Sequence, residues 1–213
     1  MTRGLVENTS ITPTVFLIGG SPGAGKTTLG VALARRIGCP SLTIDDLRTG
    51  MLGISDPTEY PELHVIGRPD AITYFTTTSP DQMIEDADAQ HTALWPAVRA
   101  IIRKRAHNRE ALVIDGWHLM PELVAADTDN GVHASWLDVD HDVLAERERD
   151  VWDFYAQSSD PDAMYRNFLA RSVRWNDRTA TAARRFGFHV MRQDGTASAS
   201  DLVAEILLDA SQR

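Results

Sequence analysis

The stretch GSPGAGKT, residues 20–27, brings three glycines, a lysine and a threonine together between an apolar run and a helical run. It matches the pattern Gly, four free positions, Gly, Lys, then Ser or Thr, which is the phosphate-binding P-loop. Glycines adopt backbone angles that side chains forbid, so successive N–H groups can turn inward around a polyphosphate. A glycine-rich turn that binds nothing is the alternative, but it does not explain the strand before the motif and the helix after it. The sequence therefore predicts a nucleoside triphosphate site.

Each polar residue of this loop has a task in that chemistry. Lys26 can reach the outer phosphates as a compact positive charge, and the Thr27 hydroxyl can ligate Mg²⁺. The helix that follows points its positive end at the anion. We expect the nucleotide, ATP, to contact Gly20, Ser21, Gly23, Ala24, Gly25, Lys26, Thr27 and Thr28.

Two carboxylates follow the second expected strand, in the stretch IDDLR. Asp45 and Asp46 should lie at the same sheet edge as the P-loop, where one could accept the proton of an acceptor hydroxyl and the other hold Mg²⁺ through water. Arg48 could clamp an anionic group of the acceptor. The structural alternative is that one aspartate only caps the next helix. The sequence leaves open which of the two is the base.

The third expected strand, ALVID, ends in an acid and continues into GWHLMPELV. Four apolar residues before Asp115 resemble the Walker B element, whose carboxylate holds the metal. Trp117 and His118 would then lie beside the phosphates and the acceptor. Packing of Trp117, and a histidine fixed by a backbone carbonyl, are the structural alternatives for these two residues.

Arginines gather in the later helical stretches, at Arg147, Arg149, Arg166, Arg171, Arg174 and Arg178. Phosphoryl transfer spreads charge over the transferred oxygens, so cationic side chains that close over the site stabilise it. Positions 171, 174 and 178 share one helix face. We expect Arg147, Arg171 and Arg174 to reach the nucleotide from a helical lid over residues 145–180, although a solvated basic face is the alternative for any single arginine.

The order of elements indicates an α/β fold. Strands are expected over 14–18, 41–44, 111–115, 132–139 and 188–191, and helices over 27–37, 80–107, 142–157, 161–186 and 200–210. Alternating strands and helices predict a five-stranded parallel sheet covered on both faces, with ligands at the carboxyl ends of the strands. Pro96 could kink or split the long helix. Residues 53–78 form the longest irregular stretch, typical of a lid or a binding segment, with plain disorder as the alternative.

Composition sets the context for this site. A chain of 213 residues, 43% hydrophobic, can form a single domain, residues 1–213, with a large buried core. The single cysteine, a polar N-terminus without a signal peptide and the lack of any membrane span indicate a cytoplasmic protein. A net charge of −9 argues against nucleic-acid binding and favours a small molecule as partner. The composition leaves monomer and homodimer open.

Several P-loop classes are excluded by missing motifs. The sequence has no Asn-Lys-x-Asp for guanine recognition, no LSGGQ-like transporter signature, and no Glu after Asp115 as in mechanical ATPases. A small kinase remains. A protein that binds ATP and signals to a partner, with slow hydrolysis, is the alternative, although it has no need for an acceptor pocket.

The motifs together carry a family resemblance. GSPGAGKTTLGVALARRIG followed by IDDLR resembles the P-loop kinases of small metabolites, a group that includes zeta toxins and chloramphenicol phosphotransferases. Residues 83–124 and 167–190 are similar to matching regions of 2-phosphoglycerate kinase. The resemblance implies an adenylate-kinase-like core, ATP with Mg²⁺, and phosphoryl transfer to a hydroxyl. By position, it implies nucleotide binding at the P-loop and acceptor or metal roles at Asp45, Asp46, Arg48, Asp115 and His118.

The acceptor side departs from that family. Asp115 stands where the family usually has Glu, and residues 56–78 carry Asp56, Glu59, Glu62 and Asp70 but only one arginine, Arg68. If this segment covers the acceptor, the acids would repel an anion, so a neutral polyol or a cationic amino compound is expected, with Arg68 in contact. Sugars, aminoglycosides, nucleosides and 2-phosphoglycerate all stay open.

Overall fold

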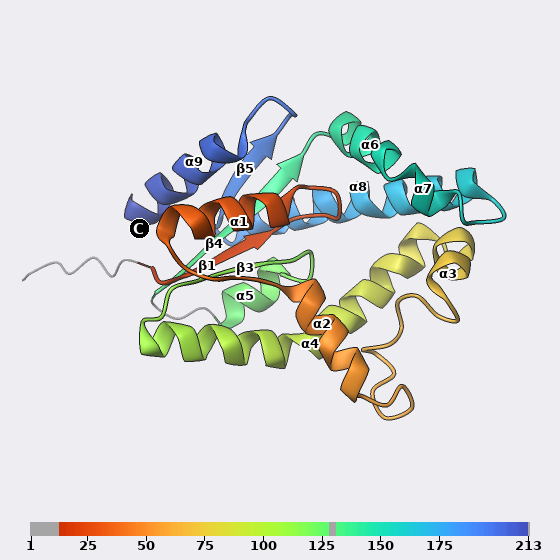
Figure 1. Ribbon diagram of the computed structural model, residues 1–213, viewed down its shortest axis with the longest axis horizontal. Coiled ribbons are helices and arrows are strands. Elements are labelled where there is room, and N and C mark those ends of the chain that lie inside the picture. The colour runs from red at the N-terminus through yellow and green to blue at the C-terminus, as the bar shows by residue number, and fades with distance from the viewer. Residues whose placement is uncertain (1–12, 128–130, 213) are drawn as a thin grey trace, which may run out of the picture.

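A computed structural model describes residues 13–127 and 131–212. Five parallel strands form one sheet in the order β2-β3-β1-β4-β5 (Figure 1). Their bounds are β1 (Val15–Gly19), β2 (Ser41–Thr43), β3 (Leu112–Asp115), β4 (Val132–Val139) and β5 (His189–Gln193). The expected α/β fold with a five-stranded parallel sheet is confirmed. Each strand boundary falls within two residues of its predicted position.

Helices cover both faces of the sheet, which gives three layers (Figure 1). On one face, α1 (Lys26–Ile37) and α9 (Ala199–Gln212) pack on Phe16, Ile18 and Met191. On the other face, α4 (Pro80–Asn108), α5 (Pro121–Asp127) and α8 (Pro161–Arg185) pack on residues of β1, β3 and β4, including Leu17 and Ile114. These strands are apolar on both sides because both sides are covered. Truncating a fully buried leucine of this core to alanine should cost about 2–5 kcal/mol.

The two long helices begin where their capping residues indicate. Ser79 accepts a hydrogen bond from the Gln82 backbone at 3.2 Å, and Asp160 accepts one from the Ala163 backbone at 3.0 Å. Each cap satisfies a backbone N–H that has no partner inside its helix. The α4 helix continues through Pro96, so the expectation that this proline could split it is wrong.

Three helices were missing from the sequence prediction: α2 (Ile44–Ile54), α3 (Ala71–Thr77) and α5. The α3 helix lies inside the stretch expected to be irregular. Its sequence AITYFTT is rich in β-branched and aromatic residues, which favour helix weakly. Packing against α8 overrides this preference, because Phe75 meets Phe168 at 5.1 Å between ring centroids and Asn167 donates to the Thr76 carbonyl.

The helix expected over 142–157 is in fact two, α6 (His141–Asp150) and α7 (Trp152–Tyr155), with Val151 between them. None of the described helices combines the length and apolar composition that crossing a bilayer requires. The expectation about a signal peptide concerns residues 1–12, which lie outside the described part of the chain.

Candidate active site

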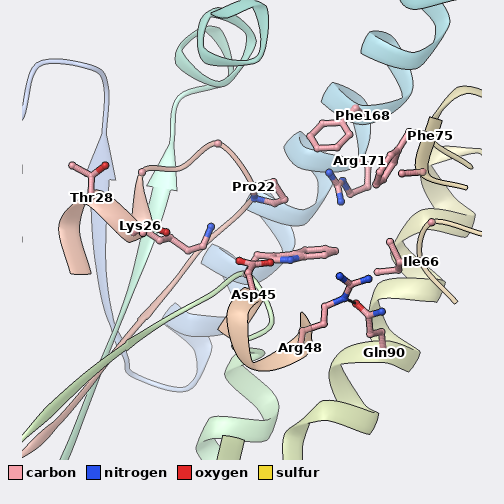
Figure 2. A pocket seen from close by; sticks show the side chains of 16 residues that line it. Pro22, Lys26, Thr28, Asp45, Arg48, Ile66, Phe75, Gln90, Phe168 and Arg171 are labelled. Carbon is pink, nitrogen blue, oxygen red and sulfur yellow. Dashed lines mark hydrogen bonds between the residues drawn. The ribbon is translucent and has the colours of Figure 1, made fainter. Parts of the chain in front are cut away.

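A cavity of about 600 Å³ opens at the carboxyl edge of the sheet, between the P-loop, α2, α3, α4 and α8 (Figure 2). Its lining is made of Pro22, Gly23, Gly25, Lys26, Thr27, Thr28, Asp45, Arg48, Ile66, Gly67, Ala71, Phe75, Gln90, Trp117, Phe168 and Arg171. The P-loop therefore shares one cavity with groups from the second and third strand ends. This is the edge at which ligands bind in open parallel sheets.

The P-loop has the backbone that a phosphate cradle needs. Gly23 has φ 74° and Gly25 has φ 89°, both in the left-handed region that favours glycine. Lys26 is buried, and its Nζ donates to the Ser21 carbonyl at 2.7 Å across the loop. Burial lowers the pKa of Lys26 to about 8, although Asp45 and Asp115 favour its charged form. The ammonium is thus held in the cavity in partly desolvated form.

Two of the residues expected to hold a metal, Thr27 and Asp115, lie in contact. Thr27 donates its hydroxyl to Asp115 Oδ1 at 2.8 Å, joining the start of α1 to the end of β3. Asp115 is only 2% exposed, and burial raises the pKa of its carboxyl. Hydroxyl and carboxylate oxygens are ligands that suit Mg²⁺, so the pair fits a magnesium ion next to a bound triphosphate.

Asp45 and Asp46 stand in the first turn of α2. Thr43 occupies the N-cap position, so neither aspartate is the cap and the structural alternative for them is wrong. Asp45 lines the cavity and faces Lys26 in Figure 2, whereas Asp46 is not among the lining residues. The base of α2 packs tightly on the turn after β3, since a Cβ at Gly116 would lie 2.9 Å from Ile44 Cβ. Asp45 is therefore carried close to Asp115.

Arg48 sits one turn along α2 and is fixed by a chain of hydrogen bonds. Its Nε donates to Gln90 Oε1 at 2.7 Å (Figure 2). Gln90 Nε2 in turn donates to the Leu63 carbonyl at 2.6 Å. Gln90 is fully buried on α4, so this chain joins α2, α4 and the segment before α3. Arg48 is held rigidly with its guanidinium at the cavity.

Arg171 lies deep in the cavity wall and is 3% exposed. Its guanidinium carbon is 4.1 Å from the centroid of Phe168 and 5.0 Å from that of Trp117. Stacking on aromatic rings stabilises a cation, but Nε and Nη2 of Arg171 have no hydrogen-bond partner within the part of the chain that the structure describes. Burial lowers the pKa of this guanidinium to about 10, which leaves it charged at neutral pH. Arg171 thus offers unused donors to a ligand.

The remaining predicted arginines lie elsewhere. Arg174 pairs with Asp81 and Arg178 pairs with Asp88, both at the α4 surface and outside the cavity lining. Arg171, Arg174 and Arg178 were expected to share one helix face. Of the three, only Arg171 lines the cavity. Arg68 contacts the Pro57 carbonyl at 3.5 Å and is also outside the lining.

Arg147 reaches the P-loop from the opposite side. Its Nη1 donates to the Gly23 and Ala24 carbonyls, each at 3.0 Å, which leaves the N–H groups of the loop free to turn inward. The next residue, Glu148, is buried, accepts from the Tyr155 hydroxyl at 2.6 Å, and would lie 3.0 Å from a Cβ at Gly23. Burial raises the pKa of Glu148. The α6 helix is therefore seated directly on the phosphate loop.

A second, smaller cavity of about 360 Å³ adjoins the P-loop on this side. It lies between α1, the end of β4 and the segment joining β5 to α9, and its lining includes Thr28, Leu137, Arg147 and Gln193. The Gln193 side chain is fixed, because its Oε1 accepts from the Gly195 backbone at 2.8 Å and its Nε2 donates to the Ala197 carbonyl. Leu29, Leu137 and Leu202 make part of its lining apolar.

Behind the cavity lies a group of buried rings. Trp117 lines the cavity, while His118 is 2% exposed and outside the lining. His118 packs on His91 of α4 at 4.6 Å between centroids, and in residues 13–127 and 131–212 none of the four ring nitrogens has a hydrogen-bond partner. Burial lowers the pKa of His118 to about 3 and that of His91 well below its usual range. The alternative of a backbone-fixed His118 is therefore not what the structure has.

Sequence reasoning missed several residues of the site. Gln90, Phe75, Phe168 and Glu148 were not predicted, although each contacts the cavity or the loop. Gln90 had a signal: it is a polar residue on the buried stripe of α4, between Ala87 and Leu94. A polar side chain in such a stripe requires partners. Phe75 and Phe168 had no local signal, because their role depends on how α3 packs against α8.

Comparison with known proteins agrees with this geometry. No family model matches the chain. A 2-phosphoglycerate kinase of Pyrococcus furiosus is 28% identical over 116 residues, which cover 54% of this chain and 38% of that protein. The chain thus spans well under half the length of this relative. A gluconokinase structure from Sinorhizobium meliloti has a TM-score of 0.50 at 17% identity, covering 94% of this chain and 93% of the other.

A structure of shikimate kinase from Acinetobacter baumannii in complex with shikimate also has a TM-score of 0.50, at 19% identity, and covers 96% of each chain. The fold is that of the P-loop small-metabolite kinases. The resemblance read from the motifs is confirmed at this level. The P-loop kinase fold places its ligands at the edge where the cavity opens.

Proposed function

We propose that this protein is a kinase that uses ATP and Mg²⁺ to phosphorylate a hydroxyl group of a small metabolite. The observation that carries the proposal is the meeting of three groups at one cavity: the Lys26 ammonium, the Thr27 hydroxyl bonded to Asp115, and the Asp45 carboxylate. A protein that only binds nucleotide has no need for the last of these. A kinase needs it to receive a proton from the acceptor.

On the donor side, ATP would supply the phosphoryl group, and Mg²⁺ would offset the negative charge of its phosphates. Gly23 and Gly25 let the backbone approach the phosphates, and Lys26 neutralises charge on the transferred oxygens. Thr27 and Asp115 are the proposed metal ligands. The smaller cavity beside Thr28 and Arg147 is the proposed binding site for the adenine ring of ATP.

On the acceptor side, Asp45 is the proposed base. It lines the cavity and faces Lys26, whereas Asp46 stands outside the lining and is left with a role through water at the metal. The Asp45 carboxylate would accept the hydroxyl proton as the acceptor oxygen bonds to the γ-phosphorus and the bond from that phosphorus to the β-phosphate oxygen breaks, which releases ADP. Trp117 would form one wall of the acceptor site.

The acceptor that fits best carries an anionic group besides its hydroxyl. The acids expected to cover the acceptor do not line the cavity: Asp70 caps α3 through the Thr73 backbone, and Asp56 bonds the Thr58 backbone. The segment contributes Ile66, Gly67, Ala71 and Phe75 instead. The charged side chains that line the cavity are one acid, Asp45, and three cations, which favours a hydroxy acid over the neutral polyol or cationic amino compound expected from the acids of residues 56–78.

The test is a product search. The protein is incubated with ATP, Mg²⁺ and a pooled library of hydroxylated metabolites that includes neutral, cationic and anionic members, and mass spectrometry looks for a compound heavier by one phosphoryl group. We expect one or a few anionic members to be converted, with ADP release that depends on them. ADP release without any acceptor, or none under all conditions, would instead support an ATP-binding regulatory protein.

A further inference from the structure

Two histidines and an aspartate meet at the edge of the sheet opposite the cavity. His133 lies near the start of β4, His189 is the first residue of β5, and Asp209 lies in the last turns of α9. One ligand atom from each residue lies within 4.8 Å of the other two. The P-loop follows the carboxyl end of β1, so this His133–His189–Asp209 cluster is separate from the proposed kinase site.

The strand register brings the two histidines together. His133 and Ser135 are two residues apart on β4 and so point to the same face of the sheet, and Ser135 pairs with His189 in the ladder. The Ser135 hydroxyl lies 3.0 Å from His133 Nε2 and 3.2 Å from His189 Nδ1. Both ring nitrogens are therefore aimed at one point on the face that α9 covers.

The α9 helix supplies carboxylates to this point. Glu205 and Asp209 are four residues apart and share one helix face. Asp209 Oδ2 lies 3.7 Å from His133 Nε2, and Glu205 Oε1 lies 3.1 Å from His189 Nε2. His189 thus turns Nδ1 toward the cluster while a carboxylate holds its other nitrogen. This is the arrangement in which metal-binding histidines are usually oriented.

We propose that the His133–His189–Asp209 cluster binds a zinc ion, with Glu205 as the residue that orients His189. Two imidazoles and one carboxylate are a ligand set that zinc accepts, and ligand atoms around a tetrahedral zinc lie roughly 3.3–3.5 Å apart. The 3.7 Å contact is close to that spacing, and side-chain rotation can close the wider one. His133 is 4% exposed and Asp209 is 23% exposed, so the ion would be half-buried.

Bound zinc would tie α9 to the starts of β4 and β5. The β4 and β5 strands, already paired in the sheet, and α9 would then share one coordination centre, and the chain would gain stability from binding in the folded state. The site takes a metal of a different class from the donor site, because imidazole nitrogens suit zinc whereas Mg²⁺ prefers oxygen ligands. Excess Mg²⁺ should therefore not compete with zinc for the His133–His189–Asp209 cluster.

The experiment titrates untagged full-length protein with zinc chloride in excess Mg²⁺, with a chromophoric chelator as competitor. We expect one zinc ion per chain and a rise in melting temperature of about 5–10 °C at a hundred times the dissociation constant. D209N and H189N should lose most of this affinity, and E205Q should lose about 10–100-fold. The matched control is H141N, which changes an exposed histidine paired with Asp177 outside the cluster and should bind zinc like the unchanged protein.

Circular dichroism first establishes that each variant is folded. If D209N or H189N is not folded, two other measurements decide. One is the zinc affinity of E205Q, and the other is the visible absorption of Co²⁺ bound to the unchanged protein, which reports tetrahedral ligation by nitrogen and oxygen. Zinc binding that is equal in the unchanged protein and the folded variants would overturn the proposal, as would less than one ion per chain or a Co²⁺ spectrum of the hydrated ion. Because none of these readouts uses ATP, their failure leaves the proposed kinase function standing.

Discussion

The two halves of the candidate active site differ in how well their polar groups are satisfied. In the phosphate half, Lys26 donates to Ser21, Thr27 donates to Asp115, and Arg147 donates to two loop carbonyls. Among the described residues of this half, the Ser21 hydroxyl is the buried polar atom without a hydrogen-bond partner. This half is preformed, so it should bind nucleotide with little rearrangement.

In the acceptor half, buried groups lack partners. Arg171, His91, His118 and Trp175 all have buried nitrogens with no hydrogen bond among the described residues. Most buried polar atoms in native proteins are paired, and an unpaired one costs about 1–3 kcal/mol. The phosphate half is thus satisfied from within the chain apart from Ser21, whereas Arg171, the one of these four residues that lines the cavity, has donors that we expect the acceptor to use.

The largest expected effect comes from the proposed base. D45N should lower kcat by about 10²–10⁴ while leaving ATP affinity almost unchanged, because it removes a proton acceptor and no phosphate contact. Steady-state kinetics and calorimetric ATP titration measure the two quantities. D46N is the matched control and should retain far more activity. Equal loss in both variants would remove the distinction between the two aspartates.

Next in size is the loss of the phosphate-binding ammonium. K26M should lower kcat by about 10²–10³, because Lys26 contacts oxygens whose charge shifts during transfer. Circular dichroism and thermal melting check that the variant is folded. Turnover close to that of the unchanged protein would contradict the phosphate-cradle interpretation of residues 20–27.

The arginine of the acceptor half should act on the acceptor more than on ATP. R171M should raise the KM of the acceptor by about 10–100-fold, the range for a hydrogen bond to a charged group. R174M is the control on the same helix. Its exposed pair with Asp81 contributes at most about 1 kcal/mol, so its kinetic constants should change by less than about fivefold. Larger effects in R174M than in R171M would contradict the inference that Arg171 binds the acceptor and Arg174 does not.

The smallest expected effect is a pH dependence of nucleotide affinity. Lys26 is protonated below its pKa of about 8 and neutral above it, so the attraction for phosphate is present at lower pH and is lost as the pH rises. From pH 7.5 to 8.5 the protonated fraction of the free protein falls about threefold. Titrations with a non-hydrolysable ATP analogue should follow this fall. A constant affinity up to pH 9.5 would indicate that Lys26 is not desolvated in solution.

The same contrast explains what the sequence could predict. The P-loop, the five strands and the carboxylates at the strand ends follow from local patterns, because spacing and periodicity determine them. The acceptor wall does not. Phe75 lies in a helix that its β-branched neighbours disfavour, and Arg171 differs from Arg174 only through the packing of α8 against α3 and α4. The acids of residues 56–70 were given the wrong role because composition does not tell which side chains face a cavity.

Gly116 lets the start of α2, which carries Asp45, pack closely on the turn after β3. Any residue with a side chain at position 116 would press on Ile44 and push the start of α2 outward. The phosphate-binding loop, which lies between β1 and α1, should be disturbed less than Asp45, the proposed proton acceptor in the first turn of α2. A G116A variant should therefore lose more of the proposed phosphoryl transfer than of its nucleotide affinity.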